Sequence, residues 1–371
     1  MEVPFIDLNI QNRAIKKEIF RLWEEIFDSA GFVGGEHVIK FEAEFAMACG
    51  VEYCVSVNSG TDALRFIFLA QGLRPGDEVI TVPNTFIGTS EAISQAGGKI
   101  VFVDVDPVTY TMNPEKIQSA ITSRTRGIVP VHIFGQTADM DAILAVSEKY
   151  GLWVVEDACQ AHLAEYKGRK AGSIGIAGAF SFYPAKNLGA CGEAGAVTTD
   201  DAKLAETVRM LRNHGEKVKY RHQIEGYNGR CDALQAAVLR VKLRYISSWN
   251  NSRRENAAHY VRFLNGAGEV ILPRAAEEHR HVYHLFVVQV SERDEVARAL
   301  LRVGIGTAIH YPTPLHLQKA YAHMSIPPGS FPVTESCAER FLSLPMFPEL
   351  TEEKIAHVCR ELIAVVKNLS K

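Results

Sequence analysis

The ten residues FSFYPAKNLG, numbered 180–189, are the most informative part of this chain. Lys186 stands after an apolar run and is flanked by Pro184 and Gly189, so a tight loop holds its amine. A lysine taken at random is a solvated surface charge in about nine cases of ten. This lysine lacks a neighbouring run of charges and follows a predicted strand, which indicates a buried, functional amine with a lowered pKa.

A second informative stretch, LWVVED, occupies residues 152–157 and reads as an apolar strand that ends in two carboxylates. Asp157 follows the carboxyl end of this predicted strand, at the sheet edge where parallel α/β proteins bind ligands. An isolated aspartate there caps a helix or lies on the surface in roughly 70% of cases. Lys186 changes that weighting, because an aldehyde cofactor with a pyridine ring needs an amine for a Schiff base and a carboxylate for the ring nitrogen.

The part of the chain between about residues 55 and 200 alternates short β-branched runs with amphipathic stretches. This alternation predicts an α/β domain with a mainly parallel sheet, whose strands are apolar throughout because both faces are buried. The predicted strands are 53–57, 78–82, 100–105, 127–133, 152–156 and 177–182, and helices are predicted at 61–70 and 139–150.

The two ends of the chain have a different texture. Residues 10–50 read as helical with a glycine-rich break at 32–35, and residues 233–263 read as one long helical connection. A strand at 284–288, a helix at 293–303 and a last helix at 351–369 follow. A chain of 371 residues exceeds one small core. We therefore expect a large domain, residues 1–250, and a smaller C-terminal α+β domain, residues 251–371.

Composition excludes several classes of protein. The chain is 47% hydrophobic and 22% charged, with a net charge of -3 and no basic block that would favour nucleic acid. No apolar run approaches the roughly 18 residues of a membrane span, and the first residues lack the pattern of a signal peptide. The seven cysteines form no Cys-x-x-Cys pair, as expected of free thiols in the cytoplasm.

Three further segments have the chemistry to hold a phosphorylated ring. Gly60 and Thr61 join a predicted strand to a helix, whose free N–H groups and dipole favour a phosphate. A plain helix cap by Ser59 or Thr61 explains the same residues equally well. Ser181 offers a second phosphate hydroxyl, or is an ordinary strand serine. Phe86 follows another strand and is either a stacking partner for the ring or part of the core.

Several of these segments resemble the DegT/StrS family of pyridoxal-phosphate (PLP)-dependent nucleotide-sugar aminotransferases. The matching runs are PFIDL at 4–8, SGTDAL at 59–64, EDACQAH at 156–162, HYP at 310–312 and GSFP at 329–332. The resemblance extends over nearly the whole chain. It implies the aspartate-aminotransferase fold (fold type I), a three-layer large domain with a mixed, mainly parallel sheet, together with the smaller α+β domain.

The resemblance also implies roles for individual residues. Lys186 forms the Schiff base with PLP and moves protons, and Asp157 pairs with the ring nitrogen. Gln160 lies beside the phenolic oxygen of the cofactor, and Phe86 stacks on the ring. The phosphate is held by Gly60, Thr61, Ser181 and, from the partner subunit, Asn228. The expected assembly is a homodimer with shared active sites.

The branch of the family is indicated by QAH at 160–162 together with KNLG at 186–189, which resemble enzymes that aminate the C3 position of a sugar. L-glutamate is the expected amino donor, and a nucleotide-linked keto sugar the acceptor. The residues that match sugar-binding positions are Tyr183, Lys219, His310 and Tyr311. A packed pair at a domain junction is an equally weighted explanation of His310 and Tyr311. Departures from the family pattern flank the sugar pocket, at Leu163, Ala185, Cys191 and Glu193.

Particular residues bear on the alternative functions. Relatives that dehydrate sugars carry histidine in place of the catalytic lysine, so Lys186 argues against dehydration. His279, His281 and His284 suggest a metal site, but a strand would turn 284 away from the other two and no cysteine or carboxylate completes the set, so no metal is predicted. Amination at C4, a regulatory protein that binds PLP without turnover, and the choice between dTDP and UDP stay open.

Overall fold

The computed structural model describes residues 1–369 and is built around a seven-stranded sheet. The strands lie in the order β1-β9-β8-β5-β4-β2-β3, and β9 runs antiparallel to both of its neighbours while the other pairs are parallel. The predicted mixed, mainly parallel sheet is therefore confirmed. Its strands are β1 (Tyr53–Val57), β2 (Glu78–Thr81), β3 (Lys99–Phe102), β4 (Thr125–Ile128), β5 (Trp153–Asp157), β8 (Ala177–Ser181) and β9 (Gly195–Thr199).

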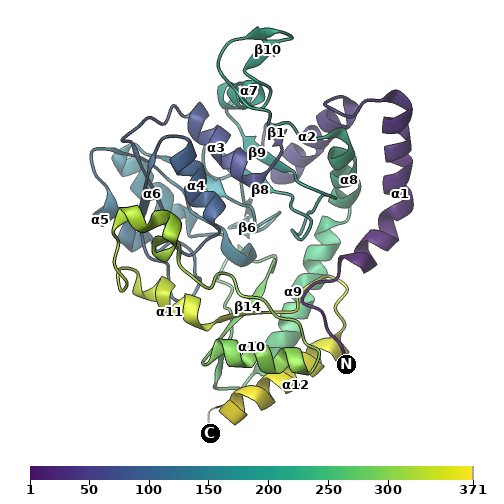
Figure 1. Ribbon diagram of the computed structural model, residues 1–371, viewed down its shortest axis with the longest axis vertical. Helices are drawn as coiled ribbons and strands as arrows, with labels where there is room; N and C mark the ends of the chain where they lie inside the picture. Colours follow the sequence, from purple (N-terminus) through teal and green to yellow (C-terminus); the bar gives the residue numbers. More distant parts are fainter. Residues whose placement is uncertain (370–371) are drawn as a thin grey trace.

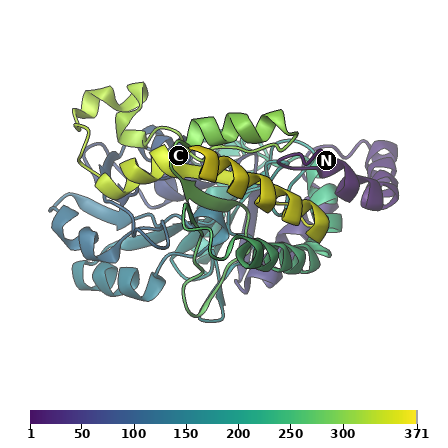
Figure 2. The same ribbon diagram turned by 90° about the horizontal axis from the view of Figure 1, so that it is seen from below.

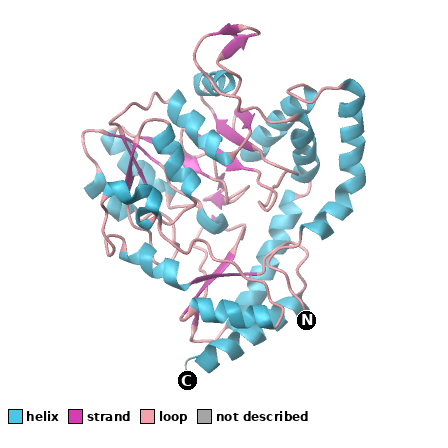
Figure 3. Cartoon of the chain, in the orientation of Figure 1, coloured by secondary structure: helices cyan, strands magenta, loops and turns pink. Residues whose placement is uncertain are grey.

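Helices cover both faces of this sheet, which gives three layers (Figures 1 and 3). One face packs against α3 (Gly60–Ala70), α4 (Ile87–Gln95) and α7 (Ala202–Leu211). The other face packs against α2 (Glu36–Cys49), α6 (Met140–Tyr150) and α8 (Ala233–Leu243). Successive strand residues point to opposite faces, so Val155 joins the first core and Val154 the second. Because both faces of the sheet are buried, most residues of its strands are apolar.

The helical ends of the large part agree with the sequence in outline. Residues 10–50 form α1 (Leu8–Ser29) and α2, and the predicted glycine-rich break separates them. Gly34 and Gly35 adopt positive φ there, a conformation that favours glycine. The predicted single helical connection at 233–263 is wrong in one respect, because α8 ends at Leu243 and α9 (Ile246–Leu264) begins after a short break.

A three-stranded antiparallel sheet forms the core of the C-terminal part, which is seen from below in Figure 2. It consists of β12 (Val270–Ile271), β14 (Phe286–Val290) and β15 (Phe341–Leu344), and packs with α9, α10 (Arg293–Arg302) and α12 (Glu352–Leu369). The predicted boundary near residue 250 falls inside α9, and the division into domains stays a prediction. The N-terminal Val3 bridges to Ile305, so both ends of the chain meet this part.

Shorter elements connect these units. A hairpin of β10 (Glu216–Val218) and β11 (Arg221–His222) projects from the top of Figure 1. A strap from residue 311 to 331 leads to α11 (Pro332–Arg340). The remaining short elements are β6 (Glu165–Tyr166), β7 (Arg169–Lys170), β13 (His279–Arg280) and α5 (Ile117–Ala120), with 3-10 turns at Pro114–Lys116, Ile133–Gly135, Leu315–Leu317 and Lys319–Met324. Among residues 1–369, no helix has the length and apolar character needed to span a membrane.

Candidate active site

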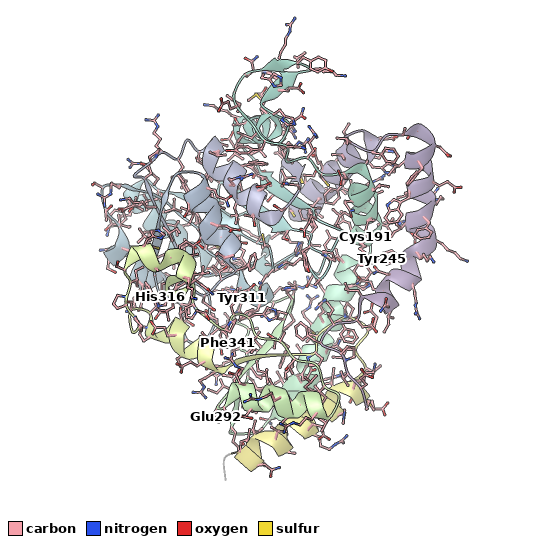
Figure 4. All side chains as sticks on the ribbon, viewed as in Figure 1. Cys191, Tyr245, Glu292, Tyr311, His316 and Phe341 are labelled. Carbon is pink, nitrogen blue, oxygen red and sulfur yellow. The ribbon has the colours of Figure 1, made fainter. Side chains whose placement is uncertain are left out.

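A cavity of about 530 Å³ opens at the carboxyl ends of β5 and β8, between the start of α3, the start of α4 and the strap. Tyr311, labelled in Figure 4, lies between the large α/β part and the C-terminal helices. Ten of the twelve residues that the sequence proposed for the site line this cavity: Gly60, Thr61, Phe86, Asp157, Gln160, Ser181, Tyr183, Lys186, His310 and Tyr311. Segments far apart in the chain therefore form one site.

The other two proposed residues do not line the cavity of their own chain. Lys219 lies in the turn of the projecting hairpin, between β10 and β11. Asn228 is exposed and bridges to Asn213, in the loop that precedes α8. Neither position contradicts a role for these residues in the site of a partner subunit.

The loop that carries Lys186 is held tightly by its own backbone. The amide of Lys186 donates to the carbonyl of Tyr183 at 2.8 Å. A Cβ atom on Gly189 would lie 2.2 Å from the carbonyl oxygen of Pro184, so only glycine fits this close approach. Burial lowers the pKa of the Lys186 amine, while Cys159 and Asp157 act in the opposite direction. The predicted lowering of this pKa therefore agrees with the structure.

Asp157 is the last residue of β5, and only 5% of its surface is exposed. Its Oδ1 accepts a hydrogen bond from the backbone N–H of Cys159 at 3.1 Å, and its Oδ2 accepts one from the hydroxyl of Thr89 at 2.7 Å. The Thr89 hydroxyl is in turn paired with that of Thr85 at 2.9 Å. These contacts fix the carboxylate at the wall of the cavity.

Thr85 and Thr89 were not predicted from the sequence. Thr89 lies three residues after Phe86, in the first turn of α4, where helical spacing places it on the side of the helix that meets the cavity. The run NTFIGT at 84–89 therefore contained a usable signal. The Thr89 hydroxyl lies one helical turn after the proposed stacking residue Phe86, where it reaches the carboxylate of Asp157.

Glu156, the neighbour of Asp157, points to the other face of the sheet and has a structural role. Its carboxylate is fully buried and accepts hydrogen bonds from the backbone N–H groups of Gly172, Ile174 and Gly175 at 2.6–2.8 Å. His132 Nδ1 accepts from a backbone N–H, so its Nε2 carries the proton that it donates to Glu156. Of the two adjacent carboxylates, only Asp157 lines the cavity.

The start of α3 forms a cradle with no room for a side chain. A Cβ atom on Gly60 would lie 2.7 Å from both Cys159 Sγ and Ser181 Cβ. Ser59 caps the helix, because its hydroxyl accepts from the N–H of Asp62 at 3.1 Å. The first N–H groups of a helix have no partner inside the helix and favour an anion. This terminus thus has a helix cap and also free N–H groups that suit an anion.

Gln160 connects the cavity wall to the strap. Its Oε1 accepts from the backbone N–H of Phe134 at 2.7 Å, and its Nε2 donates to the hydroxyl of Tyr311 at 3.2 Å. The rings of Phe86 and Tyr311 lie 6.0 Å apart between their centroids. His310 reaches the junction with the C-terminal sheet, where its Nδ1 pairs with Ser343 Oγ at 2.8 Å. The pair His310 and Tyr311 therefore lies at a junction and also lines the cavity.

Three neutral imidazoles lie near the amine of Lys186, and two of them, His284 and His310, line the cavity. Burial and the nearby Lys186 charge lower the pKa of His162 to about 3 and that of His310 to about 4. The same causes hold the pKa of His284 well below its usual value. Each ring is uncharged at neutral pH. The cavity is thus supplied with hydrogen-bonding groups without added positive charge.

The three histidines that suggested a metal site have different partners in the structure. His279 pairs with Thr137, His281 accepts from the backbone N–H of Tyr283, and only His284 lines the cavity. Among residues 1–369, no group of three or more His, Cys, Asp or Glu side chains has the geometry to hold a metal ion.

The residues present fit PLP. An amine with a lowered pKa, a fixed carboxylate, an anion cradle closed to any side chain larger than glycine, and an exposed aromatic ring share one cavity. These are the groups that a Schiff base, a protonated ring nitrogen, a phosphate and a stacked ring require. No single group is specific, but their combination is.

Comparison with known proteins agrees with this geometry. The sequence pattern of the DegT/DnrJ/EryC1/StrS aminotransferase family matches residues 13–363. The chain belongs to this aminotransferase family. A crystal structure of DesV from S. venezuelae in complex with a ketimine intermediate is 43% identical, with a TM-score of 0.96 over 98% of each chain. The fold is that of the PLP-dependent aminotransferases.

Two relatives of this aminotransferase have different names. The UDP-N-acetyl-3-dehydro-alpha-D-glucosamine 3-aminotransferase of Acidithiobacillus ferrooxidans is 45% identical, over 96% of each chain. The pleiotropic regulatory protein of Geobacillus stearothermophilus is 43% identical, over 98% of each chain.

Replacing Thr89 by valine, which has the same shape without the hydroxyl, tests how this aminotransferase orients Asp157. We expect the rate of the half-reaction with an amino donor to fall about tenfold, because Asp157 loses its shortest hydrogen bond and the Thr85 hydroxyl loses its partner. Single-turnover absorbance with an amino donor measures the effect. Ser90→Ala is the matched control, since the Ser90 hydroxyl contacts Tyr321 and not Asp157. Equal rates for Thr89→Val and the wild type would contradict the assigned role.

Proposed function

We propose that the protein is a PLP-dependent aminotransferase that moves an amino group from L-glutamate to the C3 keto group of a nucleotide-linked hexose. The observation that carries this proposal is the meeting of Lys186 and Asp157 in one cavity beside the Gly60 cradle. The name of the Acidithiobacillus ferrooxidans relative supports C3 and a nucleotide sugar. The product is an amino sugar, as used in polysaccharides, O-antigens and glycosylated natural products, and the predicted location is the cytoplasm.

We assign each residue a role that its position supports. PLP, when bound as a Schiff base to Lys186, supplies a carbonyl carbon that carries the amino group and a ring that takes up electrons. Lys186 Nζ would take the proton from the α carbon of the amino acid, because an amine with a lowered pKa is a competent base near neutral pH. Asp157 keeps the proton on the ring nitrogen, and the N-terminus of α3 holds the phosphate.

The second half of the reaction uses the same groups in reverse. Lys186 Nζ would deliver a proton to the sugar carbon that receives the amino group, and the sugar would take the place of the amino acid. Phe86 and Tyr311 bound the space on one side of the cavity. Gln160, whose oxygen accepts from Phe134, has a second N–H that would donate to the cofactor's phenolic oxygen. Both half-reactions therefore pass through one amine.

We further propose a homodimer in which each subunit completes the site of the other. Lys219 and Asn228 are the residues lent to the partner, Lys219 toward the nucleotide sugar and Asn228 toward the phosphate. Both are outside the cavity of their own chain, and Lys219 is carried on a projecting hairpin (Figure 1). Exposed apolar side chains on and beside α1 and α2, including Phe27, Ile39 and Met47, support a second chain packing there.

Glutamate-dependent amination of a panel of nucleotide sugars tests the function. The panel contains 3-keto and 4-keto hexoses, each linked to dTDP and to UDP, and the products are identified by mass. We expect a mass gain for at least one 3-keto sugar, with formation of 2-oxoglutarate. Amination of the 4-keto sugars alone would place the enzyme in the other branch, and no amination of any sugar would contradict the proposal.

A regulatory protein that binds PLP without turnover is the second candidate. The specific observation in its favour is the name of the Geobacillus stearothermophilus relative. The two functions differ in one simple property. Glutamate bleaches the visible absorption band of a PLP-dependent aminotransferase, whereas a passive binder keeps its band unchanged.

A further inference from the structure

Two buried amides near the cavity have their orientation fixed by main-chain groups. A backbone N–H only donates and a backbone carbonyl only accepts, so either one determines which end of an amide faces it. Gln160 must turn its oxygen toward the N–H of Phe134. Asn187 must turn its nitrogen toward the carbonyl of Val282, at 3.1 Å. The remaining contacts of both amides then have only one possible direction.

Asn187 fixes the hydrogen-bonding state of His284. The Asn187 nitrogen also donates to Asn250 Oδ1 at 2.8 Å, and Asn250 donates to the carbonyl of His162 at 3.0 Å. The oxygen of Asn187 is left to face His284 Nδ1 at 3.1 Å. Since an amide oxygen only accepts, His284 Nδ1 must carry the proton. Its Nε2 therefore carries a lone pair.

His284 lines the cavity, and its ring is neutral because burial and Lys186 lower its pKa. Among the described residues 1–369, no side chain or backbone group donates to His284 Nε2. The cavity thus contains a fixed hydrogen-bond acceptor that the roles described above do not use.

Gln160 fixes the opposite polarity at Tyr311. The Gln160 nitrogen donates to the hydroxyl oxygen of Tyr311, so the hydroxyl proton is free to point elsewhere. Burial raises the pKa of Tyr311, which keeps that proton in place. Tyr311 is therefore a donor toward the cavity. His310 has no such fixed state, because its partner Ser343 Oγ either donates or accepts.

We propose that His284 and Tyr311 together recognise a ketone that carries a hydroxyl on the neighbouring carbon. Tyr311 donates to an oxygen of the sugar, and His284 Nε2 accepts from the hydroxyl next to the reacting carbon. This pairing makes His284 a specificity-determining residue that selects hydroxylated sugars over their deoxy analogues. The proposal rests on the proposed sugar aminotransferase function and deepens it.

Substrate analogues test the pairing most directly. We expect the wild type to prefer a 3-keto nucleotide sugar over an analogue lacking the hydroxyl on one neighbouring carbon by about tenfold in kcat/KM, as expected of one buried hydrogen bond. Analogues lacking the 2-hydroxyl and the 4-hydroxyl are both assayed. His284→Asn keeps a donor toward Asn187 but removes the acceptor at Nε2. The kcat/KM of this variant should be about tenfold below that of the wild type for the hydroxylated sugar and nearly the same as that of the wild type for the deoxy sugar.

Two variants separate recognition from folding. His284→Gln places an amide oxygen near the position of Nε2 and should recover part of the preference. His281→Asn is the matched control, because this buried histidine contacts Tyr283 outside the cavity. The dissociation constants of both sugars for the Lys186→Ala variant, measured by calorimetry, should show the same preference without turnover.

Each outcome is decisive. Equal losses on hydroxylated and deoxy sugars would overturn the pairing, because His284 would then act only on packing. A loss confined to the glutamate half-reaction, measured by bleaching of the absorption band, would assign His284 to the amino donor and overturn it too. If the wild type aminates no keto sugar, the proposed function fails, and the pairing falls with it.

Discussion

Replacing Lys186 by alanine is expected to abolish the half-reaction with glutamate. In the proposed mechanism the amine is both the attachment point of PLP and the base that moves the proton, and loss of such a group costs at least about 10⁴ in rate. The neutral rings of His162 and His284 lie near but are too weakly basic to replace it, because burial lowers the pKa of both. Rapid mixing of the PLP-loaded variant with glutamate measures the rate from the visible absorption band.

A second buried lysine provides the control. Lys242 in α8 is 2% exposed, and burial lowers its pKa as it does for Lys186, but it lies outside the cavity. Lys242→Met should retain the half-reaction. Reduction of the wild type with borohydride, followed by peptide mass, should place the cofactor on the peptide that contains Lys186. Normal turnover by Lys186→Ala, or a label on another peptide, would contradict the assignment.

The fold was largely predictable because its signals are local. Most strands of the large sheet are short runs rich in apolar residues, and the predicted runs at 53–57 and 177–182 match β1 and β8 to within one residue. The strand β9 was missed because its sequence, GAVTT, is short and contains small residues. Its place in the sheet depends on antiparallel pairing with β1 and β8, which are distant in sequence. Local patterns do not encode such pairing.

The chemical residues of the site were predictable for a similar reason, while their supports were not. Asp157 ends β5 and Lys186 lies in the loop that follows β8, and a parallel sheet brings the carboxyl ends of its strands to one edge. Thr89 contacts Asp157 across 68 residues, and Asn187 contacts His284 across 97. Nothing in the local sequence reveals that these side chains meet. The direction of each hydrogen bond also depends on main-chain groups that only the folded chain brings close.

The proposed contribution of a second chain to the site has no signal in the sequence of one chain. Asn228 and Lys219 were proposed from the resemblance, and no local pattern marks them as ligands. Both residues are exposed in the single chain. Any completion of the cavity by a partner depends on a contact between two copies, which neither periodicity nor spacing along one sequence encodes.

The second large effect is expected for Asp157→Asn. The substitution keeps the size of the side chain and its contact with the Cys159 N–H but removes the negative charge that holds a proton on the ring nitrogen. Without that proton the ring takes up electrons poorly, so the rate of proton removal from glutamate should fall by about 10²–10³, the usual loss for a group that stabilises charge in the transition state.

The pattern of losses separates this residue from Lys186. Asp157→Asn retains the amine and the phosphate cradle, so the protein should still take up PLP on Lys186 and still show a visible band. Removal of the Asp157 charge also removes an interaction that raises the pKa of Lys186, so that pKa should fall further. Stopped-flow absorbance with glutamate measures the loss of rate, and the pH dependence of PLP uptake by the PLP-free protein measures the pKa of the Lys186 amine.

Glu156→Gln is the control for Asp157→Asn, because the adjacent carboxylate is equally buried but faces the opposite side of the sheet. Glu156 accepts three backbone N–H groups and the His132 ring, so its variant should lose stability, by about 1–3 kcal/mol, without a selective loss of proton transfer. A half-reaction rate for Asp157→Asn within about threefold of the wild type, well below the expected loss, would mean that another group protonates the ring. In the described cavity, Asp157 accepts hydrogen bonds from Thr89 and from the Cys159 N–H. The contact from Thr89 in α4 to Asp157 in β5 would then need an explanation other than orienting a carboxylate toward the ring nitrogen.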